Sequence, residues 1–80
     1  MPDPRVKDVQ VTNDVLIVLL RDGRKVGAPL QWFPKLMAAT VDQRKVWEMS
    51  AAGHGIHWPQ IDEDLSVEGL LRGCPAPGAR

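Results

Sequence analysis

Two histidines stand three residues apart, at His54 and His57, and several acids follow them along the chain. Imidazole and carboxylate groups are zinc ligands, and a zinc site needs three or four of them converging at about 2 Å. The glycines on both sides of His54 favour a bend leading into a strand, and residues three apart on a strand point to opposite faces. We therefore expect a solvated His54, a half-buried His57 and no metal site.

Nucleophilic chemistry would need a nucleophile with an adjacent base. Ser50, Ser66 and Cys74 are formal nucleophiles, and His57 with the acids after it could act as the base. None of the three lies in a motif such as G-x-S-x-G, and Gly53 to Gly55 is no phosphate-binding loop. The single cysteine forms no internal disulfide and no C-x-x-C pair. We expect no enzymatic activity and no cofactor, with a small hydrolytic or metal enzyme as the third hypothesis.

The charges balance, because ten Lys and Arg stand against ten Asp and Glu, and this removes the long-range attraction that brings basic proteins to nucleic acids. Arg21, Arg24 and Lys25 surround one turn dipeptide, and Arg44 and Lys45 lie on an expected helix. On one face they would form a basic patch. Otherwise they are charged because hairpin tips and exposed helix faces are solvated.

Four of the ten acids lie in an expected loop between Asp62 and Glu68. We expect the side chains of Asp62 and Asp64 to accept hydrogen bonds from backbone amides within a turn. Glu63 and Glu68 would then be free to contact a basic partner. The candidate partner-binding residues are Glu63, Glu68, Arg24 and Lys25.

The size and composition predict one core. With 80 residues, 44% hydrophobic and 25% charged, the chain has an ordinary globular composition, and we expect one domain over residues 1–73 with a flexible tail over 74–80. The N-terminal MPDPRVKD lacks an apolar signal core, and the longest apolar run, Val15 to Leu20, is too short to span a bilayer. A cytoplasmic protein without membrane contact is expected.

Two turn dipeptides, Asn13-Asp14 and Asp22-Gly23, divide the N-terminal part into three strand-like runs. They predict a three-stranded antiparallel meander, with positive φ at Gly23. The run from Val15 to Leu20 is apolar at every position, so it should be the central strand, covered on both faces or nearly so.

Two short helices should follow the meander. Pro34 suits a first helical turn, so we expect a turn over Leu30 to Phe33 and a helix over Pro34 to Ala39. Thr40 and Gln43 form a capping-box pattern that begins a second helix over Val41 to Val46. The residues expected to cover the sheet are Leu30, Phe33, Leu36 and Met37.

The last part of the chain predicts a hairpin and a helical turn. Residues 47–51 and 56–58 read as its strands, Pro59 ends the second, and Ser66 caps the turn. Together these elements give an α+β fold, in which a small antiparallel sheet, built from the meander and the later hairpin, packs with two short helices and a C-terminal helical turn. Leu65, Val67, Leu70 and Leu71 should return to the core. Trp32, Trp47 and Trp58 should lie in the core or at its edge, and one partly exposed tryptophan could anchor a partner.

The order of these motifs, R-D-G-R, PLQWFPKL, T-x-x-Q-R, W-E-M-S and GHGIHWPQIDEDLSVEGLL, resembles the bacterial domain of unknown function 2442 family from about Arg5 to Gly73. The resemblance implies a small α+β module without established activity. Some members are joined to a helix-turn-helix, which we do not expect in this chain, and others are encoded beside small toxin-like proteins. The most specific positions, which we expect to be structural, are Gly55, Ile56, His57, Trp58, Pro59, Asp62 and Asp64.

Two functional hypotheses come before the enzymatic one. The first is a non-enzymatic module that binds another small protein, as the antitoxin-like partner of a neighbouring protein. The alternative is an accessory nucleic-acid-binding or transcription-regulating domain, which the zero net charge makes the weaker of the two. A homo-oligomer remains open.

Overall fold

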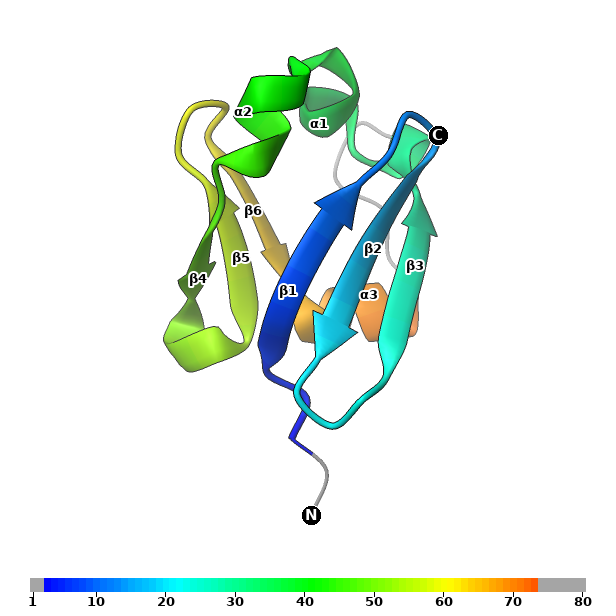
Figure 1. Ribbon diagram of the computed structural model, residues 1–80, viewed down its shortest axis with the longest axis vertical. Helices are drawn as coiled ribbons and strands as arrows, with labels where there is room; N and C mark the ends of the chain where they lie inside the picture. Colours follow the sequence, from blue (N-terminus) through cyan, green and yellow to red (C-terminus); the bar gives the residue numbers. More distant parts are fainter. Residues whose placement is uncertain (1–2, 74–80) are drawn as a thin grey trace.

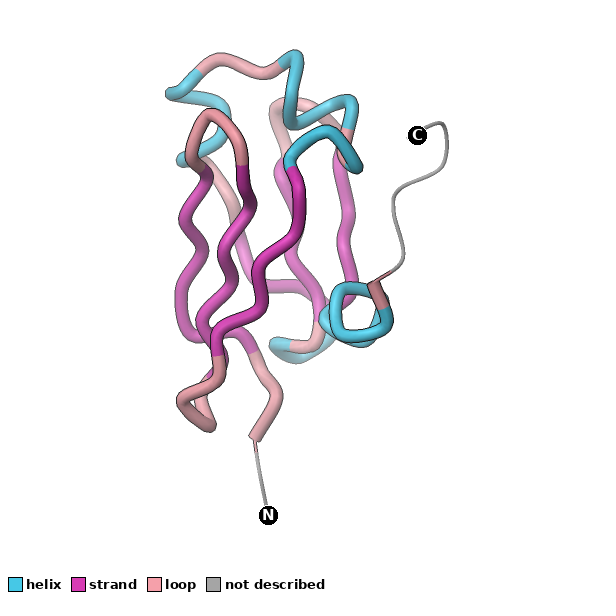
Figure 2. The backbone as a smooth tube through the Cα atoms, turned by 90° about the vertical axis from the view of Figure 1, so that its right-hand side faces the viewer, coloured by secondary structure: helices cyan, strands magenta, loops and turns pink. Residues whose placement is uncertain are grey.

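In the computed structural model, which describes residues 3–73, two antiparallel sheets of three strands face each other across the core (Figures 1 and 2). The strand order is β1-β2-β3 in the first sheet and β4-β5-β6 in the second. The α+β class is confirmed. The strands are β1 (Val6–Val11), β2 (Val15–Leu20), β3 (Lys25–Pro29), β4 (Glu48–Ser50), β5 (Gly55–Trp58) and β6 (Glu63–Ser66).

The N-terminal meander has β2 at its centre, as predicted. Leu16, Val18 and Leu20 are fully buried, whereas the residues between them face outward and are only half-buried. The expectation that this strand is covered on both faces is therefore wrong for its outer face. The register shifts between Val6 and Asp8, which makes the intervening residue a β-bulge. Gly23 has a φ of 94°, so the predicted left-handed turn is confirmed.

The helical segments lie at the two ends of the sheets. At one end the 3-10 turn η1 (Leu30–Trp32) leads into α1 (Pro34–Ala38) and α2 (Val41–Lys45). Both hydrogen bonds of the predicted capping box between Thr40 and Gln43 are present, at 2.9 and 3.1 Å. At the other end α3 (Val67–Arg72) begins with the predicted Ser66 cap, whose Oγ accepts from the Gly69 N–H at 2.9 Å.

Two expected core residues are exposed. Met37 is 53% exposed, because α1 is a little over one turn long and its single inward face is taken by Leu36. Leu71 is 45% exposed, because Val67 and Leu70 form the inward face of α3. The prediction that Met37 and Leu71 cover the core is therefore wrong at both positions. Cys74 and the expected tail over residues 74–80 lie outside the described residues.

The segment expected as an acidic loop is the third strand of the second sheet. Residues 63–66 pair with residues 55–58 of β5, with Glu63 opposite Trp58 and Asp64 opposite His57. Acidic residues are rare in strands, so local propensity argued against this element. Pairing with β5 is what places the acids in a strand.

The core is centred on Trp58. This side chain is fully buried, and its indole N–H donates to the Arg44 carbonyl at 3.1 Å, which ties β5 to the end of α2. Phe33 and Leu36 are also fully buried and close the same end of the sandwich. Trp32 and Trp47 are partly buried against the core, as predicted.

The 3-10 turn η2 (Ala51–Gly53), between β4 and β5, is left-handed at alanine. Ala51 has a φ of 50° and Ala52 a φ of 56°, a conformation that costs an L-residue about 1–2 kcal/mol. We expect Ala52→Gly to raise the free energy of unfolding by about 0.5–1 kcal/mol, because glycine removes that cost but loses more chain entropy on folding. Urea unfolding measures the change.

The matched control is Ala38→Gly in α1. Ala38 is exposed and helical, so there the same substitution should lower the free energy of unfolding by about 0.5–1 kcal/mol. Equal destabilisation by both changes would show that the turn at Ala52 carries no strain.

Candidate functional site

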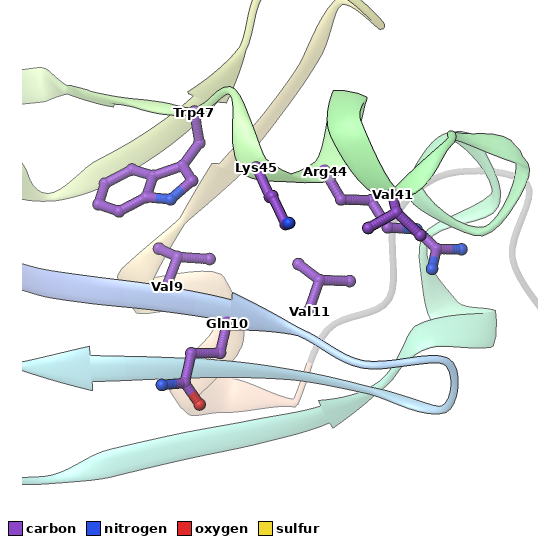
Figure 3. Close-up of a pocket in the computed structure, with 7 residues that line it drawn as sticks. All are labelled: Val9, Gln10, Val11, Val41, Arg44, Lys45 and Trp47. Carbon is purple, nitrogen blue, oxygen red and sulfur yellow. The ribbon is translucent and has the colours of Figure 1, made fainter.

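A groove of about 270 Å³ lies between β1 and α2 (Figure 3). Val9 and Val11 are on the core-facing side of β1, and in Figure 3 their side chains point toward Trp47 and Lys45, whereas Gln10 points away. Trp47 is half-buried, and Val41 is 60% exposed. The groove therefore has an apolar lining that the chain itself leaves partly uncovered. It is lined by Val9, Gln10, Val11, Val41, Arg44, Lys45 and Trp47.

Main-chain groups of β1 border this groove. In an antiparallel pair, hydrogen-bonded residue pairs alternate with non-bonded ones. The Thr12 N–H donates to the Val15 carbonyl at 2.9 Å, so two residues along the strand Gln10 and Ile17 form the next bonded pair. Val9 and Val11 then turn their N–H and C=O groups away from β2. β1 is thus an edge strand whose hydrogen-bonding groups face the groove.

One cation is available at the groove. The Arg44 guanidinium is occupied, because it donates to the Leu36 carbonyl at 2.9 Å and to the Met37 carbonyl at 3.0 Å, which closes the end of α1. Lys45 is exposed, and within residues 3–73 its ammonium has no hydrogen-bond or ion-pair partner. The groove therefore combines an apolar lining, a strand edge and a single uncommitted positive charge.

Glu63 is not free to meet a partner. It is only 8% exposed, and its carboxylate accepts from the Asp64 N–H at 3.0 Å, because β6 places it opposite Trp58. The expectation of a free Glu63 is therefore wrong. Glu68 is exposed but forms an i,i+4 ion pair with Arg72 on α3. The two glutamates lie near opposite ends of residues 62–68 and form no common acidic surface.

The aspartates also differ from expectation. The Asp64 carboxylate lies 2.8 Å from Nδ1 of His57, its neighbour across the β5–β6 pair, and within residues 3–73 it accepts from no backbone amide. Asp62 has a φ of 51° and uses its main-chain carbonyl, which accepts from Lys35 Nζ at 2.8 Å. The predicted backbone caps by these two side chains are wrong. His57 is half-buried and His54 exposed, as predicted.

The remaining family-signature residues serve packing. Ile56 and Trp58 are fully buried, and Pro59 follows the last residue of β5, as predicted. Gly55 is required by close approach, because a Cβ there would lie 2.5 Å from Ser50 Oγ and 3.3 Å from the Leu65 carbonyl oxygen.

The basic residues do not form one patch. Arg24 donates to the Asp22 carboxylate at 2.9 Å, and this hydrogen bond lowers the pKa of Asp22. Lys25 is exposed at the start of β3. Figure 1 places this β2–β3 end of the molecule opposite the end that carries α2 with Arg44 and Lys45. The two groups of basic residues therefore lie in separate regions of the described structure.

A second hollow, of about 440 Å³, lies beside α3 and includes His54, Ser66 and Glu68. Three of the polar groups beside it are already engaged. The His54 carbonyl accepts from the Val67 N–H at 2.9 Å, Ser66 Oγ caps α3, and Glu68 pairs with Arg72.

Within residues 3–73 no three His, Cys, Asp or Glu side chains come together in a group that could hold a metal ion. No helix in that range is both long and apolar enough to cross a membrane.

Sequence reasoning singled out Trp47 and Lys45 separately but not the groove. Val9 and Val11 read as ordinary strand residues, and Val41 as an ordinary helix residue. The one signal in the sequence was the apolar Val41 at the first position of an otherwise polar helix, VDQRK.

Comparison with known proteins gives a family and two similar structures. Residues 6–76 match the sequence profile described as protein of unknown function (DUF2442). A crystal structure of a protein of unknown function from Rhodospirillum rubrum is 29% identical with a TM-score of 0.77, and the match covers 92% of each chain. The solution structure of an uncharacterized protein from Chromobacterium violaceum is 25% identical, also with a TM-score of 0.77, over 92% of this chain and 70% of that one. No curated protein matches the chain.

Proposed function

The chain belongs to the DUF2442 family of proteins of unknown function, and we propose that this member is a non-enzymatic module that binds an extended segment of another small protein. The observation that carries the proposal is the groove between β1 and α2, where an apolar lining, an unpaired strand edge and an uncommitted lysine meet. The side chains that line it include no hydroxyl, thiol, imidazole or carboxylate.

The binding mode is strand addition at β1. An extended segment gains main-chain hydrogen bonds from the edge of a sheet, while every second side chain enters the pockets beside that edge. Here Val9 and Val11 would supply the main-chain groups. A side chain of the segment would then lie between Val11, Val41 and Trp47.

The lining indicates the chemistry of the segment. An apolar side chain matches the valines and Trp47, since aromatic residues at a groove are the usual interface anchors. Lys45 favours an acidic residue in the same segment, because a charge at the rim mainly sets the encounter rate and partner choice. The expected ligand is therefore an extended segment that combines apolar with acidic residues.

The partner we propose is a small toxin-like protein encoded in a neighbouring reading frame, with this chain as its antitoxin-like counterpart, as the family resemblance implies. Its signature would be an exposed strand or terminal segment with the apolar and acidic pattern described above. Co-expression followed by a pull-down tests this identity separately from the binding mode.

The binding mode is tested with a phage-displayed library of random peptides, from which selected sequences are synthesised and titrated. We expect enrichment of sequences that alternate apolar residues with Asp or Glu, and amide shifts centred on Val9 and Val11 in NMR spectra. Lys45→Glu should weaken binding about tenfold, because it replaces an attraction with a repulsion of similar size.

The matched control is Arg21→Glu, which reverses an exposed charge at the opposite end of the sheet and should leave affinity unchanged. Selected peptides that bind Lys45→Glu as tightly as the unmodified protein, or that shift amides elsewhere, would disprove the groove as the site. A library that yields no enriched peptide would do the same.

A further inference from the structure

The outer face of the β1-β2-β3 sheet carries a second, independent surface. On β2 the residues that point away from the core, Val15, Ile17 and Leu19, are all apolar and half-exposed. Figure 1 looks onto this face, and no described helix or strand lies over it. Outward-facing residues of a solvated sheet are normally polar. The apolar residues along the outer face of β2 therefore indicate that another surface packs against this sheet.

The charges beside this row are arranged symmetrically. The register places Asp8 of β1 and Lys25 of β3 on either side of Leu19. Both are exposed, and neither has an ion-pair partner within residues 3–73. Across the three strands, an acidic, an apolar and a basic side chain therefore lie side by side at this level of the sheet.

Two residues away along β2, Ile17 lies between a residue with a large side chain and a glycine, which has none. Gln10 and Gly27 flank Ile17 in the same way, and a Cβ at Gly27 would approach nothing closer than 3.9 Å. The surface therefore has a projection on its β1 side and a depression on its β3 side.

We propose that this face binds the same face of a second copy of the chain, about a two-fold axis parallel to β2. That operation places the β1 side of one copy over the β3 side of the other, so Asp8 meets Lys25 of the second copy at two symmetric positions. Gln10 then covers Gly27, and Ile17 and Leu19 meet their own counterparts. A two-fold axis perpendicular to the strands would place β1 over β1 of the second copy, and Asp8 would then meet no basic residue.

The small area of the face points to a weak dimer. Six-residue strands of about 3.3 Å per residue and a strand spacing of about 4.8 Å give a footprint on the order of 300 Å². This is well below the roughly 800 Å² per partner of a standard stable interface. The dimer should therefore be weak and should depend on protein concentration and on salt.

The test is sedimentation equilibrium over a wide range of concentrations at low and at raised salt. We expect a monomer–dimer equilibrium that raised salt weakens. Asp8→Lys alone, and Lys25→Asp alone, should each weaken the dimer about tenfold, because both ion pairs become repulsive. The double variant Asp8→Lys with Lys25→Asp should restore it, since the pairs return with their signs exchanged.

Ile17→Lys should abolish the dimer, and Lys45→Glu should leave it unchanged, which separates this face from the peptide groove. Circular dichroism verifies the fold, and the exposed charge variants keep the test valid should Ile17→Lys unfold. A monomer at every concentration overturns the proposal. Single charge variants that dimerise normally also overturn it. A double variant that does not recover dimerisation overturns it as well, because it excludes the axis parallel to β2.

Discussion

Trp58→Ala should lower the free energy of unfolding by about 3–5 kcal/mol, enough to unfold much of the protein at physiological temperature. Trp58 is fully buried and is the largest side chain of the core. Its loss leaves a cavity between the two sheets and removes the hydrogen bond to the Arg44 carbonyl. Thermal and urea unfolding, followed by circular dichroism, measure the effect.

Trp58→Phe separates the two contributions. Phenylalanine keeps most of the apolar volume but cannot donate to Arg44, so it should cost less than alanine, about 1–3 kcal/mol from the unpaired carbonyl and the smaller ring. A Trp58→Ala protein with an unchanged melting temperature would mean that Trp58 lies at the surface, contrary to the structure.

Gly55→Ala should lower the free energy of unfolding by about 1–3 kcal/mol, the usual cost of an overpacked core. The added Cβ would lie 2.5 Å from Ser50 Oγ and 3.3 Å from the Leu65 carbonyl, one contact on each side of β5. The cost arises from close packing between β4, β5 and β6, since Gly55 does not have a positive φ.

A double-mutant cycle with Ser50→Ala checks the cause. Ser50→Ala alone removes a small half-buried hydroxyl and should have little effect, whereas combined with Gly55→Ala it should recover part of the lost stability. The contact with the Leu65 main chain persists, so recovery should be incomplete. Strictly additive effects of the two changes would exclude the Ser50 contact as the source.

Several elements followed from the sequence because their causes are local. The Thr40–Gln43 capping box satisfies two backbone donors within four residues, and the turn at Gly23 needs only the absence of a Cβ. β2 was identified by its unbroken apolar run, and Trp58 by its place in the strand before Pro59. The family membership came from the same linear motifs.

The misassigned elements depend on contacts between distant parts of the chain. Glu63 belongs to a strand only because Trp58 lies opposite it, and no local preference of an acidic segment indicates that pairing. His57 and Asp64 meet for the same reason, seven residues apart in sequence. An interpretation made without the β5–β6 register therefore took buried and paired acids for free ones.

The amino-acid sequence by itself determined the fold class, the family, the central strand and the helix starts, because hydrophobic periodicity and capping act over a few residues. Only the tertiary structure decided which charges are free and which surfaces are uncovered. Lys45 is available because Arg44 is used to close α1, and Val9 faces Trp47 only across the edge of the sandwich. A charge is free, or a surface uncovered, only if no other part of the chain packs against it. That packing joins segments far apart in sequence, so no short stretch of sequence indicates it.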